Sequence, residues 1–211
     1  MVISTSTLCD LDAPSESSSI RMAGLADIPA IERITQEGPP AGIEPEVMSC
    51  ATRLLLTLVA FEHGALWVEQ ARDGSILRAA TAIPAGQLPP RRSLMRDVAQ
   101  QLGAAPTLLP AAAGLGKAFL TELDAVHPAW VLIEISKPSS HRNGDPALLR
   151  VALEWARAQS NPGSDPVMVL ADSMPERAAA ERLGFVERRT WGYGWPWWLG
   201  VAAPVAHASD G

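Results

Sequence analysis

An apolar segment, a polar loop and an amphipathic segment follow one another between residues 130 and 159, and they constrain the fold more than any other feature. Residues 130–135 read Trp-Val-Leu-Ile-Glu-Ile, which is typical of a buried strand, and residues 146–159 have helical spacing. The polar loop of residues 136–145 between them contains a glycine. A strand that leads through such a loop into a helix directs backbone N–H groups at a phosphate. The loop is degenerate, because Pro146 has no N–H to donate.

Composition predicts one globular domain. The chain has 211 residues, of which 47% are hydrophobic and 19% are charged, and this combination is typical of a protein with a packed core. We expect a flexible leader over residues 1–19, a domain over 20–203 and a flexible tail over 204–211. The net charge of −6 argues against a general nucleic-acid binder and against a polybasic membrane-surface protein.

The sequence also predicts a cytoplasmic protein without a membrane partner. The amino terminus has no basic lead followed by an apolar run, and the apolar segment 54–61 is too short to cross a bilayer. The two cysteines, Cys9 and Cys50, have neither a partner cysteine nor a histidine at metal-binding spacing. We therefore expect neither a disulfide framework nor a metal site.

Apolar periodicity alternates between strand and helix along the chain. An Asp-Gly turn at residues 73–74 separates two apolar runs and predicts a hairpin. The pattern indicates an α/β fold with a mixed sheet and helices on both faces. The predicted strands are 20–23, 65–70, 75–83, 130–135, 167–170, 185–191 and 197–203. The predicted helices are 27–36 (capped by Asp27), 44–62, 92–123 (interrupted near residues 106–110), 146–159 and 175–183.

Four phrases, in this order, resemble the GCN5-related N-acetyltransferase (GNAT) superfamily, with a pattern closest to the puromycin N-acetyltransferase type. They are Ala-Gly-Leu-Ala-Asp-Ile-Pro-Ala-Ile at 23–31, the hairpin of 65–84, His-Pro-Ala-Trp-Val-Leu at 127–132 and Ala-Ala-Glu-Arg-Leu-Gly-Phe at 179–185. The resemblance covers roughly residues 20–200 and implies a single-domain GNAT fold with about seven strands in a mostly antiparallel sheet. It also implies transfer of an acyl group, acetyl in most cases, from a thioester donor to the amine of a small molecule.

The resemblance implies that the loop after residue 135 holds the pyrophosphate of acetyl-CoA. In this chain the loop departs from the family pattern, because Pro146 stands at the second glycine and Asp145 adds a carboxylate close to the phosphates. In an alternative register, Asn143 and Asp145 occupy the glycine positions, which is less favourable for the cofactor. The residues assigned to cofactor binding are Ile135, His141, Arg142, Asn143 and Gly144.

Two residues are candidates for catalysis. Glu134 is a carboxylate within an apolar strand. A buried position would raise its pKa and suit it to act as a general base; alternatively, it points outward from a strand whose other face is buried. The family's tyrosine general acid corresponds to Ala180, which leaves Tyr193, the only tyrosine of the chain, as the candidate acid. The family's cofactor-contacting asparagine corresponds to Glu176. Compared with the puromycin type, the segment from Trp130 to Pro138, which contains the fourth strand, is also one residue short, which predicts the loss of a β-bulge.

Four of the seven tryptophans lie between residues 191 and 198, around the tyrosine. Aromatic side chains at this density suit an apolar partner or a dimer surface, and alternation would turn about half of these rings inward. We assign Trp191 and Trp195 to substrate binding, with a homodimer interface as an alternative role for the cluster.

Three functions remain open at this point. The first is a small-molecule N-acetyltransferase with a divergent loop. The second is an acyltransferase whose donor is a carrier protein or an aminoacyl-tRNA, although the acidic charge disfavours RNA. The third is a catalytically silent binding or assembly subunit. Loss of the loop and of the tyrosine favours the second and third functions, whereas the resemblance to an antibiotic-modifying type favours the first.

Overall fold

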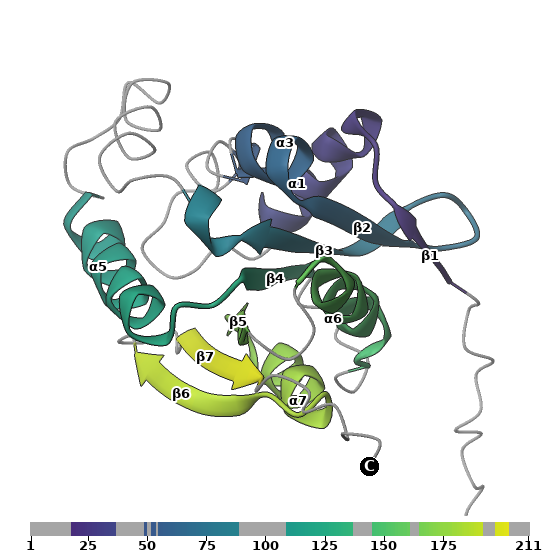
Figure 1. Cartoon of the computed structure of the whole chain (residues 1–211). Coiled ribbons are helices and arrows are strands. Elements are labelled where there is room, and N and C mark those ends of the chain that lie inside the picture. The colour runs from purple at the N-terminus through teal and green to yellow at the C-terminus, as the bar shows by residue number, and fades with distance from the viewer. Residues whose placement is uncertain are drawn as a thin grey trace, which may run out of the picture.

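A single seven-stranded sheet forms the centre of the molecule, in the strand order β1-β2-β3-β4-β5-β7-β6 (Figure 1). The computed structural model describes residues 18–36, 49, 52–53, 55–88, 109–136, 145–160, 165–191 and 197–202. The strands are β1 Ser19–Met22, β2 Ala65–Gln70, β3 Ile76–Pro84, β4 Trp130–Ser136, β5 Val167–Ala171, β6 Val186–Trp191 and β7 Trp197–Ala202. The helices are α1 Ile28–Gln36, α3 Phe61–His63, α5 Leu109–Val126, α6 Ala147–Gln159 and α7 Met174–Arg182. Three shorter helical turns are η1 Leu25–Asp27, η2 Leu56–Ala60 and η3 Ala85–Gln87.

Helices cover both faces of this sheet, which confirms the predicted α/β architecture. On one face, α6 and α7 cover alternate residues of the central strands, including Trp67, Leu132 and Val169. On the other face, α1 and η2 cover the β2–β3 end, and α5 lies over Val131 and Met168. Consecutive residues of β4 and β5 therefore belong to different cores, as the alternation of a strand requires.

The one parallel strand pair, β4 with β5, separates before either strand ends. Its ladder runs from Trp130 beside Val167 to Ile133 beside Leu170, while β4 continues to Ser136. All the other pairs are antiparallel. The last three residues of β4 consequently have a sheet neighbour on the β3 side only.

The register of β4 against β3 is regular along its whole length, from Trp130 opposite Pro84 to Ser136 opposite Arg78. The short fourth strand predicted the loss of a bulge, and β4 has none in this pairing. The separation of β4 from β5 therefore arises where their ladder stops and does not need an extra residue in β4.

The first helix α1 begins directly after Asp27 and ends at Gln36, as predicted, but the contacts of the Asp27 side chain differ from those of a simple cap. The turn η1 precedes α1 and ends at Asp27. The Asp27 carboxylate instead accepts the N–H of Gly24 at 2.8 Å and two guanidinium hydrogen bonds from Arg21, each of 2.8 Å. The ion pair with Arg21 of β1 holds the Asp27 carboxylate in this position, and it joins the start of the first helix to the edge of the sheet.

Other boundaries shift by a few residues. The helix α5 begins at Leu109 and includes Pro110 in its first turn, which a helix tolerates, and it extends to Val126 rather than to residue 123. The described part of the predicted 44–62 helix includes the π-helical turn η2 and ends at His63. The sheet begins at Ser19, one residue before the predicted domain. Residues 1–17, 89–108 and 203–211 lie outside the described part of the chain.

No helix among the described residues has both the length and the apolar character needed to cross a bilayer.

Gly64 fixes the turn from the helical segment into β2. A Cβ atom at this position would lie 2.1 Å from the carbonyl oxygen of Ala82, an atom of the neighbouring strand backbone. Strand backbone cannot move aside without breaking the ladder between β2 and β3.

We therefore expect Gly64→Ala to lower the free energy of unfolding by about 3 kcal/mol, as measured by chemical denaturation. Gly86→Ala is the matched control, because a Cβ atom at Gly86 would meet nothing within 4 Å. Equal stability of the two variants would show that the turn between α3 and β2 can relax around a side chain.

Candidate active site

Arg78, near the start of β3, is a buried cation that contacts carboxylates from several elements. Its side chain is only 9% exposed. Its Nε donates to Glu69 Oε2 of β2 at 2.6 Å, and its Nη1 donates to Glu134 Oε1 of β4 at 3.1 Å. The same Nη1 donates to the backbone oxygen of Asp145 at 3.0 Å, directly before α6. One guanidinium thus joins β2, β3, β4 and the start of α6.

The register of the sheet explains this convergence. Glu69 lies opposite Arg78 in the β2–β3 hairpin, and Ser136 lies opposite Arg78 in the β3–β4 pair. Glu134 is two residues before Ser136 and therefore points to the same face of the sheet. That face is the one covered by α6 and α7.

Glu134 is buried within this cluster, which is one of the two orientations that its position in an apolar strand allows. The residue is 6% exposed. Burial raises the pKa of its carboxyl from 4.5 to about 7, although the charge of Arg78 acts in the opposite direction. Oε1 faces Arg78, whereas Oε2 is buried and has no hydrogen-bond partner among the described residues. A buried carboxylate oxygen without a donor can accept a proton from a bound ligand.

A second buried carboxyl, Glu176, lies in the first turn of α7 and is 4% exposed. The hydroxyl of Ser136 at the end of β4 donates to its Oε1 at 2.5 Å. The N–H of Asp172, just after β5, donates to its Oε2 at 3.0 Å. Burial, followed by the negative charges of Asp172 and Glu134, raises its pKa well above the ordinary value.

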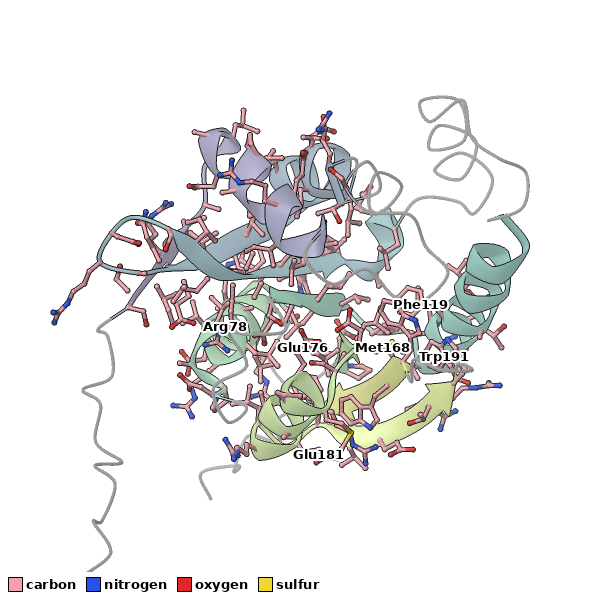
Figure 2. The ribbon with its side chains drawn as sticks, turned by 180° about the vertical axis from the view of Figure 1, so that it is seen from behind. Arg78, Phe119, Met168, Glu176, Glu181 and Trp191 are labelled. Atoms are coloured by element: carbon pink, nitrogen blue, oxygen red, sulfur yellow. The ribbon has the colours of Figure 1, made fainter. Side chains whose placement is uncertain are left out.

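These groups meet where β4 and β5 separate. Ser136 ends β4, Asp172 follows β5, and Glu176 links the two from α7. Figure 2 shows Arg78 and Glu176 inside the molecule, on the same side of the central strands. The site therefore offers two buried carboxyl groups in different surroundings, one beside a cation and one beside other carboxylates. Such a pair can take up a proton at one position and release a proton at another.

The start of α6 has an internal carboxylate where a phosphate would bind. Asp145 Oδ1 accepts the N–H of Ala147 at 3.0 Å, and Asp145 Oδ2 is 3.8 Å from Nη2 of Arg78. Pro146 has no N–H. The described end of the predicted phosphate loop therefore presents a negative charge, and neither Pro146 nor Ala147 has an N–H left for a phosphate.

The remaining predicted site residues are distributed over both faces of the sheet. The Ile135 side chain packs on the opposite face from Glu134, against the core beneath α1. Trp191, at the end of β6, also lies on that opposite face and packs beneath α5 near Phe119 and Met168 (Figure 2). The structure does not bring Trp191 to Glu134. The predicted residues that fall outside the described part of the chain are His141, Arg142, Asn143, Gly144, Tyr193 and Trp195.

Sequence reasoning missed the central role of Arg78. The available signal was an arginine inside an apolar strand, opposite Glu69 in a hairpin that the sequence did predict. A cross-strand pair of opposite charges is a recognisable pattern. Ser136 and Asp172 gave no comparable signal, because their contacts with Glu176 depend on how α7 docks against the sheet.

Within the described residues, no group of three or more histidine, cysteine, aspartate or glutamate side chains is placed to hold a metal ion.

Comparison with solved structures identifies the architecture. A protein named SsHAT superposes with a TM-score of 0.65 at 18% identity, covering 89% of this chain and 99% of that one. A histone acetyltransferase HPA2-related protein from Corynebacterium glutamicum gives 0.57 at 17% identity, covering 91% and 99%. A GNAT superfamily phosphinothricin acetyltransferase from Sinorhizobium meliloti, solved with acetyl-CoA, gives 0.52 at 13% identity, covering 89% and 88%. The chain has the GNAT fold. No model of a known protein family matches the sequence, and no curated protein matches it either.

The fold resemblance predicted from four short phrases is thereby confirmed, including the mixed sheet of seven strands. The particular likeness to the puromycin N-acetyltransferase type stays a prediction.

The raised pKa of Glu134 gives a prediction for stability. Because the folded chain holds this proton more tightly than the unfolded chain, the carboxyl favours folding at low pH, and the advantage is lost as the pH rises from 4.5 through 7. Between these limits the loss amounts to about 3 kcal/mol. We expect Glu134→Gln to remove this part of the pH dependence, as measured by urea denaturation at a series of pH values. Glu181→Gln, which changes an exposed carboxyl of α7, is the control, and a slope identical to wild type in Glu134→Gln would contradict the assignment.

Proposed function

We propose that this chain is an N-acyltransferase that transfers an acyl group, in the simplest case acetyl, from a thioester donor to the amine of a small molecule. The observation that carries this proposal is Glu134, a buried carboxyl with a pKa of about 7 beside the point where β4 and β5 separate. The neighbours in fold support the reaction class, since they include enzymes that acetylate phosphinothricin, agmatine and polyamines.

The first step of such a reaction is removal of a proton from the attacking amine. A general base is most effective when its pKa lies near the working pH. The Oε2 oxygen of Glu134 has no partner among the described residues, while Arg78 holds Oε1 in place. Glu134 is thus positioned to accept the amine proton on Oε2, and Arg78 acts as the residue that orients the carboxylate.

The neutral amine then attacks the thioester carbonyl carbon. A C–N bond forms and the C–S bond breaks, and the nitrogen releases a second proton to solvent to give the neutral amide. During the attack, negative charge develops on the carbonyl oxygen. Backbone N–H groups that lie in a fixed orientation stabilise such charge. We assign this role to the backbone around Ile135, because the β4–β5 ladder ends at Ile133 and leaves the following residues of β4 without a neighbour on that side.

The identity of the donor is a separate question. A solved neighbour binds acetyl-CoA, which makes acetyl-CoA the first donor to test, with residues 141–144 as its proposed phosphate contacts. The carboxylate of Asp145 at the start of α6 favours a second candidate, namely an acyltransferase whose donor has no pyrophosphate at this position. An acylated carrier protein meets this description, and so does an aminoacyl-tRNA, although the net charge of −6 opposes an RNA partner.

The reaction is tested by mass spectrometry of amines incubated with the protein and a donor. Suitable acceptors are agmatine, phosphinothricin and spermidine, and suitable donors are acetyl-CoA and the acetyl thioester of N-acetylcysteamine. We expect acetylation of at least one amine and a fall in kcat/KM of about 10²-fold or more in Glu134→Gln. Glu181→Gln should retain the wild-type rate. Absence of product with every pair, from a protein shown to be folded, would overturn the proposed function.

The role of Asp145 in donor selection is tested by Asp145→Asn. Asparagine can still accept the Ala147 N–H, but it removes the negative charge that would face a phosphate. We expect acetyl-CoA to bind about tenfold more tightly, as measured by calorimetry. Asp124→Asn, on the exposed side of α5, should leave the affinity unchanged. Equal affinities in wild type and Asp145→Asn would show that the donor does not approach the start of α6.

A further inference from the structure

Glu176 is a buried carboxyl that has no cationic partner among the described residues. Arg78, the cation of the site, contacts Glu69, Glu134 and Asp145. Arg177, the next residue along α7, pairs instead with Glu181 at 2.8 Å and Glu187 at 3.0 Å.

Burial and the neighbouring carboxyl groups favour the protonated form of Glu176, while the hydrogen bond from Ser136 acts in the opposite direction. The Asp172 carboxyl shares a side-chain hydrogen bond with Glu176, and Glu134 adds a further negative charge. Two carboxyl groups can form a hydrogen bond only when one of them holds a proton. The Ser136 hydroxyl and the Asp172 N–H satisfy the two oxygens of Glu176 without adding positive charge. Burial without a cationic partner therefore raises the pKa of Glu176 well above its ordinary value and favours the protonated carboxyl.

The contact with Ser136 gives this proton a route to the reacting groups. Ser136 Oγ lies 2.5 Å from Glu176 Oε1. Ser136 and Glu134 are two residues apart on β4 and so point to the same face. Glu134 Oε2, which is buried and unpartnered among the described residues, marks the place where a ligand would complete the site. Glu134 is also close enough for its charge to act on Glu176, which places both carboxyl groups in one buried cluster.

We propose that Glu176 supplies, through the hydroxyl of Ser136, the proton that the leaving thiolate takes up during acyl transfer. This inference rests on the proposed function. When Glu176 is protonated, its hydroxyl can donate to Ser136 Oγ across the same 2.5 Å contact, which frees the serine hydrogen for the ligand. As the C–S bond breaks, the sulfur takes the hydroxyl proton of Ser136, and Ser136 takes the proton of Glu176. Glu134 has gained the amine proton in the same turnover. Exchange of one proton with solvent then returns Glu176 to its protonated form and Glu134 to its carboxylate.

The first test asks whether Glu176 holds a proton, independently of any activity. Infrared spectroscopy of the whole protein, at a pH well above the pKa of Glu134, should show the carbonyl band of a protonated carboxyl. The band should persist in Glu181→Gln, which changes a carboxyl on the outer side of the same helix (Figure 2), and disappear in Glu176→Gln. Absence of the band in wild type would overturn the inference while leaving the proposed function standing.

The second test asks whether that proton reaches the leaving group. Two acetyl donors are tested, each together with the best acceptor amine. One is the acetyl thioester of N-acetylcysteamine, whose alkyl thiolate leaves poorly without a proton. The other is the acetyl thioester of 4-nitrothiophenol, whose thiolate leaves without a proton. In Glu176→Gln and in Ser136→Ala we expect kcat to fall about 10²-fold with the alkyl donor and less than about threefold with the aryl donor. Glu181→Gln should match wild type with both donors.

The remaining outcomes also decide the matter. Equal losses with both donors would show that Glu176 and Ser136 act only on structure, and unchanged rates would show that the proton comes from elsewhere, for example from Tyr193. Either result overturns the inference and leaves the acyltransferase standing. If wild type transfers acetyl from no donor, the proposed function fails and the role of the Glu176 proton fails with it, even when the infrared band is present.

Discussion

The buried guanidinium of Arg78 is the interaction on which the rest of the site depends. Without it, the carboxylates of Glu69 and Glu134 would lie close together beneath α6 with no compensating charge, and burial of unpaired charge is costly. Its contacts with Asp145 also fix the point at which α6 begins. Arg78 therefore stabilises the sheet, orients the proposed base and holds the negatively charged Asp145 at the start of α6.

The separation of β4 from β5 turns this buried cluster into a candidate site. If their ladder continued to the end of β4, strand pairing would cover that edge, and the base would lie in an ordinary core. Because the ladder stops at Ile133 and Leu170, Ser136 contacts α7 through Glu176 instead. Glu134 and Glu176 then have different partners, and burial raises the pKa of both carboxyl groups.

The two faces of the sheet differ in the residues that they carry. The face beneath α6 and α7 holds the charged cluster, whereas the face beneath α1 and α5 holds apolar cores that contain Ile135 and Trp191. The sequence assigned Trp191 to substrate binding because of its aromatic neighbours, and this pattern does not specify a face of the sheet. In the structure, Trp191 of β6 and Glu134 of β4 point to opposite faces.

The sequence by itself determined the order of strands and helices, the hairpin at Asp73 and Gly74, and the position of Glu134 within an apolar strand. Local periodicity, turn residues and one polar residue within an apolar run are sufficient for these features. Only the tertiary structure decided that Arg78 holds Glu134, that Glu176 lies against Ser136, and that Asp145 contacts Arg78. These contacts join residues 40 to 67 positions apart, or in the case of Glu69 nine positions apart across a hairpin. They form because strand register and helix docking place the residues on one face of the sheet, and no local pattern encodes that docking.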